Sequence, residues 1–339
     1  MPEWRRRRRM GLVLGQIISL CIAGTGVFSS QLAAAGVNIP TTQSFLNYAL
    51  LGGFGCVLAV KNGGIRLQSP WWGYAVIAVL DVEANALAVM AYQYTSVTSV
   101  LLLDCFTIVC CMILSRIFLR ASYLFTHLVG VFICFLGLLI LVLSDVLEPP
   151  GEAGKDRLFG DALCLLASFL YACSNVAQEV AVKQSDRLTF LAMLGFFGAP
   201  VCGIQALVFD RSGVAAVNWT EDHGANIWML FGFVATLHIM YHLTSLYLTL
   251  DDATFLNLSL LTSDVWGVIA SVVLFHTPPP SLYFVAFFFI LVGLWIYGYH
   301  PLPSALEQHR DCLVTIEPGF EESDMEGRCV VFSMPTAPT

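Results

Sequence analysis

The sequence predicts an all-α integral membrane protein with ten transmembrane helices, and three observations support this prediction. Apolar residues make up 57% of the 339 residues, charged residues only 12%, and the mean hydropathy is +0.76. Because soluble chains carry about 25% charged residues, a fold in water could not hide this much apolar surface. The apolar residues also fall in runs of about 20, the length that crosses a hydrocarbon core of about 30 Å.

Residues that end helices separate the expected spans. The spans cover residues 10–35, 42–60, 71–92, 96–119, 123–146, 159–182, 188–209, 226–248, 252–276 and 280–299. Pro149 and Pro150 follow the fifth span, and Pro278 and Pro279 follow the ninth. Proline cannot donate the backbone hydrogen bond that a continuing helix needs. These segments are therefore predicted as turns between spans.

The distribution of positive charge predicts the orientation. If the N-terminus is cytosolic, 13 of the 16 Lys and Arg residues lie in cytosolic segments, among them Arg5 to Arg9. Multi-pass proteins keep their positive charge on the cytosolic side, so both termini are expected in the cytosol. This topology places Asn218, which begins an Asn-Trp-Thr glycosylation sequon, on the extracytosolic side. The plasma membrane is the expected location, with a Golgi or endosomal membrane as the alternative.

The chain is expected to consist of two similar halves. The expected segments are a basic cytosolic N-terminus at 1–9, a first five-helix repeat at 10–146, an extracytosolic linker at 147–158, a second five-helix repeat at 159–299 and a disordered cytosolic tail at 300–339. A shift of 156 residues superposes Trp72 on Trp228, and a smaller shift superposes Ser19 on Ser168. Because five is odd, the second half must enter from the opposite side, as in the inverted repeats of secondary transporters. Removal of the first span as a signal peptide is the alternative, and it would break this symmetry.

Several stretches resemble a known transporter family. They are residues 14–22, 42–48, 81–85, 91–100, 103–105, 174–179 and 261–264. Asp-Val-Glu-Ala-Asn at 81–85 and Tyr-Gln-Tyr-Thr at 92–95 are the most specific of them. The chain is similar to the F subfamily of solute carrier family thirty-five, in the drug/metabolite transporter superfamily, over about residues 11–298. This resemblance implies a ten-helix carrier with a five-plus-five inverted repeat. It also points to queuine-like modified nucleobases, with which members of the subfamily have been connected.

Five carboxylates fall inside the expected spans: Asp81, Glu83, Asp104, Glu179 and Asp264. An ionised carboxylate in hydrocarbon costs at least ~2.5–3.5 kcal/mol, so each should face a wet cavity or a partner. A hydrogen bond between packed helices is the alternative for every one of them. On the third span, Glu83 points about 200° away from Asp81, so at most one of these two acids looks straight into a cavity. Glu83 and Glu179 are the leading pair.

Polar neighbours of these acids complete the expected solute cavity. Its residues are Glu83, Glu179, Asn85, Asp81, Tyr92, Gln93, Asp104, Asn175 and Asp264, and Tyr171 could stack on a ring. Apart from Arg116 near the end of the fourth span, no Arg lies in an expected span, and Lys183 is expected to snorkel to the cytosolic surface, so phosphate-bearing solutes are disfavoured. A secondary transporter of a neutral or cationic heterocycle, such as a queuine-like nucleobase or a nucleoside, is expected, with proton coupling as an option. A nucleotide-sugar carrier and a non-transporting receptor or scaffold remain the alternatives.

No enzyme class is favoured, and neither a cofactor nor a metal is expected. His238 and His242 could bind a metal in a membrane oxidase, but a working site needs further ligands. Asp104 and Asp264 could serve an intramembrane aspartyl protease, but the glycine-rich context of that chemistry is missing. No structural disulfide is expected, because no expected external loop contains a cysteine. The expected partners are a small solute and the lipid bilayer, without nucleic acid; a homodimer is left open.

The topology can be tested with epitope tags. A tag at either terminus is expected to be shielded from impermeant antibodies on the extracytosolic side, because both termini lie in the cytosol in this topology. Antibody binding before and after selective permeabilisation measures it. A tag inserted beside Asn218 is the control, since it should be reached from the extracytosolic side. An N-terminal tag exposed there would overturn the orientation.

Overall fold

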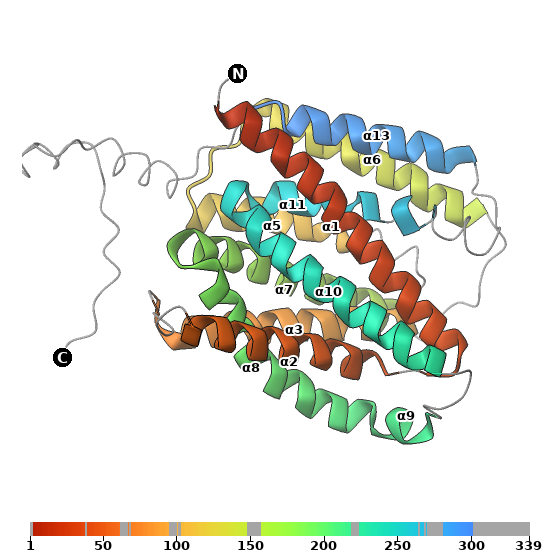
Figure 1. The fold of residues 1–339 in the computed structure, drawn as a ribbon. Helices are drawn as coiled ribbons and strands as arrows, with labels where there is room; N and C mark the ends of the chain where they lie inside the picture. The colour runs from red at the N-terminus through yellow and green to blue at the C-terminus, as the bar shows by residue number, and fades with distance from the viewer. Residues whose placement is uncertain are drawn as a thin grey trace, which may run out of the picture.

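The computed structural model describes residues 3–37, 39–61, 67, 69–94, 100, 103–147, 157–217, 224–263, 265–267, 269 and 281–300. Its helices are α1 (Glu3–Ala34), α2 (Pro40–Lys61), α3 (Trp71–Tyr94), α5 (Phe106–Phe118), α6 (Phe125–Leu147), α7 (Arg157–Gln184), α8 (Arg187–Phe209), α9 (Arg211–Ala216), α10 (Ala225–Leu250), α11 (Ala253–Leu260) and α13 (Ser281–Tyr297). The described residues contain no strand, which confirms the all-α class. Figure 1 shows α6 and α13 side by side along one edge of the bundle, with α2, α3 and α8 toward the other.

The outer surface of the bundle suits lipid. By length and composition, α1, α3, α7, α8 and α10 can each cross a membrane, and α5, α6 and α13 contain shorter apolar segments. Large apolar side chains such as Phe125, Leu158, Leu207 and Trp228 are exposed. Water-soluble proteins rarely expose such surfaces, whereas lipid tails would cover them. The chain is a multi-pass membrane protein, and the count of ten spans stays a prediction.

Two spans that the sequence predicts as continuous are interrupted. The fourth has a turn at Cys105 and the ninth has a turn at Leu261. At each turn an amide bonds a carbonyl three residues back instead of four, from Ile108 to Cys105 and from Leu261 to Leu258. Cys105 and Leu261 are 156 residues apart, the shift that superposes the two halves of the sequence. The interruptions therefore fall at equivalent places in the two halves.

The ends of other helices also differ from expectation. α1 begins at Glu3 and so includes the basic run, which was expected to precede the first span. The short helix α9 (Arg211–Ala216) was not expected at all. It directly follows Asp210, whose buried side chain accepts a hydrogen bond from the backbone amide of Thr42 at 2.6 Å. This bond uses one of the orphan amides of the first turn of α2.

Helix contacts occur in matching pairs. α2 packs on α8 and α6 packs on α13, while α1 packs on α10 and α3 packs on α7. If α1 corresponds to α7 and α3 to α10, as the sequence shifts indicate, exchange of the halves converts the α1–α10 contact into the α7–α3 contact. The packing therefore has the pattern that two repeats related by a twofold axis would produce.

Two hydrogen bonds follow the same correspondence. The hydroxyl of Ser19 on α1 donates to the carbonyl of Ser259 on α11 at 2.8 Å. The hydroxyl of Ser168 on α7 donates to the carbonyl of Leu103 at 3.2 Å. The donors are the pair that the smaller sequence shift superposes, and the acceptors are 156 residues apart. The two halves thus match to the residue at this contact.

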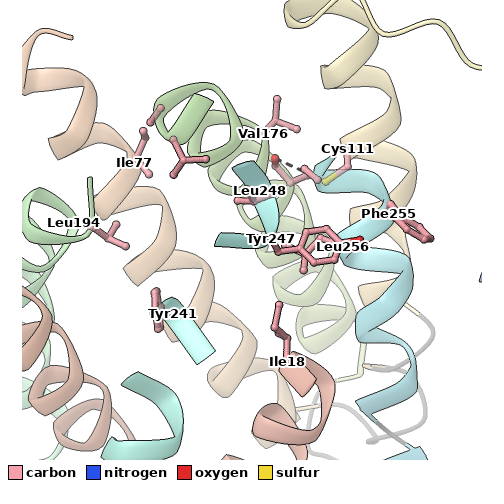
Figure 2. Packing of buried hydrophobic residues seen from close by; sticks show 14 of the residues in the cluster. Ile18, Ile77, Cys111, Val176, Leu194, Tyr241, Tyr247, Leu248, Phe255 and Leu256 are labelled. Atoms are coloured by element: carbon pink, nitrogen blue, oxygen red, sulfur yellow. Dashed lines mark hydrogen bonds between the residues drawn. The ribbon is translucent and has the colours of Figure 1, made fainter. Parts of the chain in front are cut away.

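One apolar cluster occupies the middle of the bundle. Figure 2 shows members of this cluster, including Ile18 of α1, Val176 of α7, Tyr247 of α10 and Leu256 of α11. These four side chains are at most 3% exposed. The cluster holds helices of both halves together, and the polar groups described below are set into it.

Glycine allows the closest approach between the halves. A Cβ atom added to Gly195 on α8 would lie 2.1 Å from the backbone nitrogen of Gly52 on α2. No side chain fits there, so the two backbones touch directly. On the neighbouring residue Gly53, an added Cβ atom would meet nothing within 4 Å.

This contact makes a stability prediction. Gly195→Ala should force α2 and α8 apart and lower the free energy of unfolding by about 1–3 kcal/mol, the usual cost of overpacking. Thermal unfolding of the detergent-solubilised protein measures the change. Gly53→Ala is the matched control and should be neutral or slightly stabilising, because alanine favours helix. Equal stability of the two variants would contradict the close α2–α8 contact.

Candidate functional site

A buried carboxylate lies where four helices meet. Asp81 on α3 is 5% exposed, and its Oδ2 atom accepts hydrogen bonds from Tyr48 on α2 at 2.6 Å and Tyr241 on α10 at 2.7 Å. Its Oδ1 atom accepts from Ser174 and Gln178 on α7, each at 3.3 Å. All four donors are uncharged. Hydrogen bonds therefore replace the cation that a buried carboxylate usually has.

The side-chain amide of Asn85 lies beside this carboxylate. Asn85, one turn after Asp81, donates to the Tyr48 hydroxyl at 3.4 Å and to the Asp81 carbonyl at 2.8 Å. Its side-chain oxygen accepts from Tyr171 at 2.9 Å. Asp81 and Asn85 therefore share a face of α3. Tyr171 makes a hydrogen bond here, whereas the sequence suggested only stacking or packing for it.

Glu83 lies on the other side of α3, as its spacing from Asp81 predicts. It is half-buried, and its Oε1 atom accepts a hydrogen bond from Gln205 on α8 at 2.9 Å. The structure therefore does not bring Glu83 together with Glu179, whose partners lie on α7 and α11. Whether these two acids act on the solute stays a prediction.

Glu179 on α7 joins two helices near the end of the bundle that holds the N-terminus. Its Oε1 atom is 2.7 Å from Nζ of Lys183, and its Oε2 atom accepts from the amide of Ala253, at the start of α11, at 2.8 Å. The side chains of Lys183 and Glu179 are 6% and 1% exposed. The expectation that Lys183 snorkels to the surface is wrong, because the ion pair keeps its ammonium group inside.

Asparagines continue the contact between α7 and α11. Asn175 Nδ2 donates to the side-chain oxygen of Asn257 at 3.2 Å, and Asn257 Nδ2 lies 3.4 Å from the sulfur of Cys111 on α5. Asn175 and Glu179, four residues apart, thus both face α11. No local pattern in the sequence pairs Asn175 with Asn257.

Asp104 stands at the interruption of the fourth span. It directly precedes the turn at Cys105, and its Oδ1 atom has only long contacts, 3.4 Å to Thr107 and 3.5 Å to Ser168. The residue is exposed. Broken helices often border the solute site of a carrier, and a loosely held acid at a break is suited to that role.

An ion cluster that the sequence did not reveal closes around Arg8 of α1. Its guanidinium, 6% exposed as a residue, pairs with Asp251 and with Asp252 at 3.3 Å, and it lies 4.8 Å from the ring centre of Phe255. It also donates to the carbonyl of His300 at 3.4 Å. The adjacent acids 251 and 252 were the available signal, but the Arg run was interpreted only as a topology marker.

Some expected residues lie outside the described part of the structure. These are Asp264, Asn218 and the side chains of Tyr92 and Gln93. His238 and His242 lie 4.7 Å apart between ring centres and pack edge-on to Phe54. Among the residues that the structure describes, no group of three His, Cys, Asp or Glu side chains is arranged to hold a metal ion.

Fold and site together define a multi-pass helical solute transporter of the drug/metabolite transporter class. The sequence profile of "Solute carrier family 35" (SLC35F) matches residues 4–299, and the chain belongs to this family. A protein of known crystal structure, 14% identical, superposes with a TM-score of 0.69 over 85% of this chain and 96% of that one, which shows a shared fold.

Named relatives agree with the family. Solute carrier family 35 member F2 of Mus musculus is 40% identical over 294 residues, which are 84% of this chain and 77% of that protein. The Xenopus tropicalis member F2 is 35% identical over 303 residues, 86% of this chain and 77% of that protein. A family member of Schizosaccharomyces pombe is 34% identical over 84% of this chain and 56% of its own length. These relatives are solute carriers by name.

The Glu179–Lys183 pair makes a second stability prediction. Glu179→Gln removes the carboxylate that lies 2.7 Å from the buried Lys183 ammonium, so the free energy of unfolding should fall by about 3–5 kcal/mol. Adding Lys183→Met should recover most of this loss, because the buried ammonium is then removed as well. Thermal unfolding of the single and double variants measures both steps. A double variant as unstable as Glu179→Gln alone would show that the ion pair is not the cause.

Proposed function

We propose that this carrier is a secondary transporter that moves a neutral or cationic heterocycle, such as a queuine-like nucleobase or a nucleoside, by alternating access. The observation that carries the proposal is the carboxylate of Asp81, which lies where helices of both halves meet and is held by uncharged donors alone. Carboxylate, amide and phenol oxygens accept hydrogen bonds from ring N–H groups, and a carboxylate also attracts cations and repels anions.

Three cationic side chains inside the described bundle are already engaged. Arg8 binds Asp251 and Asp252, and Lys183 binds Glu179. Arg187 donates to the carbonyl of His242 at 3.3 Å. A nucleotide sugar brings a diphosphate that needs cations in its site. The nucleotide-sugar alternative is therefore disfavoured.

A more distant relative supports a cationic solute. A protein of Toxoplasma gondii, 27% identical over 173 residues, is named a chloroquine resistance transporter. The match covers 48% of this chain and 19% of that protein. Chloroquine is a basic aromatic heterocycle, the chemical class that an acidic and phenolic site favours.

Alternating access is supported by a difference between the two halves. α7 packs against α10, whereas the equivalent helix α1 makes at most marginal contact with α3, the equivalent of α10, in the described residues. The contacts from Glu179 and Asn175 to α11 lie near the end that holds the N-terminus. We take this as a state closed at that end. Exchanging the conformations of the two inverted repeats would open it and close the other end.

Uptake by the purified protein in liposomes tests the function. Tritiated queuine, adenosine and thiamine should include at least one solute that enters faster than into protein-free vesicles, because each is neutral or cationic. A UDP-sugar should enter no faster than into the control vesicles. Uptake of the UDP-sugar alone would favour the nucleotide-sugar carrier. Absence of uptake for every solute would favour the receptor or scaffold.

A further inference from the structure

We propose that Asp81, Tyr48 and Tyr241 form a proton-binding site that couples proton movement to solute movement. This inference rests on the proposed transport function and names its coupling ion. Asp81 takes the proton-binding role that the sequence favours for Glu83 and Glu179.

Three oxygen atoms form a closed triangle. Asp81 Oδ2 is 2.6 Å from the Tyr48 hydroxyl and 2.7 Å from the Tyr241 hydroxyl, and the two hydroxyls are 2.8 Å from each other. Each distance is that of an O–H···O hydrogen bond. Two phenols supply only two protons for these three contacts. While Asp81 is ionised, one contact therefore holds no proton and brings two lone pairs together.

One more proton completes the triangle. If Asp81 carries a proton on Oδ2, it donates to one tyrosine, that tyrosine donates to the other, and the second tyrosine donates back to Oδ2. Each of the three O···O contacts then contains one hydrogen atom, and no group outside the triangle has to take part. The geometry accommodates one additional proton without movement of a heavy atom.

The groups around the triangle allow both the ionised and the protonated form of Asp81. From α7, only the uncharged Ser174 and Gln178 reach Asp81, and they bind its other oxygen. From α8, the thiol of Cys202 is buried, and Glu83, on the opposite face of α3, is turned toward Gln205 of α8. From α10, the ring of His242 faces Phe54 and His238. In the described residues, no cation therefore fixes Asp81 as an anion, while several donors stabilise the anion when it forms.

The triangle also links parts that must move. Tyr48 and Asp81 belong to the first half, whereas Tyr241, Ser174 and Gln178 belong to the second. An ionised Asp81 attracts all four donors and ties α3 to α7 and α10. A protonated Asp81 has a weaker hold on them, since hydrogen bonds to a neutral group are weaker than those to a charged one. Proton binding thus changes how firmly the halves are held together.

Transport under a pH gradient tests the proposal. Purified protein in liposomes should accumulate tritiated queuine when a pH gradient is imposed, and should exchange labelled for unlabelled queuine when the pH is equal on both sides. Asp81→Asn should lose the response to the gradient, because asparagine cannot take up or release the proton, and any exchange that it retains should not depend on pH. Asp210→Asn, at the buried carboxylate that binds the amide of Thr42, is the control and should keep the gradient response.

A gentler variant guards against loss of folding. Tyr241→Phe removes one oxygen of the triangle at nearly constant shape, so the anion loses a donor and the midpoint of the uptake–pH curve should rise by about one pH unit. An unchanged midpoint, or a gradient response in Asp81→Asn, would overturn the proton site. Wild-type uptake that ignores the gradient would overturn the proton site and leave the carrier function intact. No uptake at all would remove both.

Discussion

Asp81 is a buried acid in an apolar bundle, and in the described residues it has no cationic partner. The neighbouring helices must therefore be placed so that they supply its hydrogen-bond donors. Asp81 can be buried only because hydroxyl and amide groups of α2, α7 and α10 point at its two oxygens. Each donor must be held in place by its own helix, so the positions of three helices around α3 are tied to one carboxylate. The apolar cluster holds the two halves together, but such contacts would allow several arrangements. The hydrogen bonds to Asp81 favour one of them.

The two halves of the chain share packing contacts but differ in their charged residues. Packing features repeat in both halves, such as the hydroxyl-to-carbonyl bonds of Ser19 and Ser168. Charged features do not. The residue equivalent to Asp81, 156 positions later, is Leu237, and the residue equivalent to Glu179, 149 positions earlier, is Ser30. If the two halves form the predicted inverted repeat, they can adopt two equivalent conformations, and charges present in only one half give the two ends of the protein different properties.

The sequence predicted the class, most helix positions and the two faces of α3, because hydropathy and helical periodicity are local properties. It did not predict the partners. Tyr241 and Asp81 are 160 residues apart, and only packing brings them together. Lys183 was misjudged for the opposite reason. Its position near a span end suggests the surface, but a carboxylate one turn earlier keeps it inside. A local sequence pattern indicates the usual environment of a residue. The partners that the residue meets in the folded protein determine its actual environment.

The basic run at the start of α1 serves at two different times. In the predicted topology, the five adjacent arginines keep the N-terminus on the cytosolic side during synthesis. In the folded protein one of them, Arg8, pairs with Asp251 and Asp252, residues that are made more than 240 positions later. Folding thus neutralises one of the five charges, so the newly made segment presents more positive charge than the same segment in the folded chain.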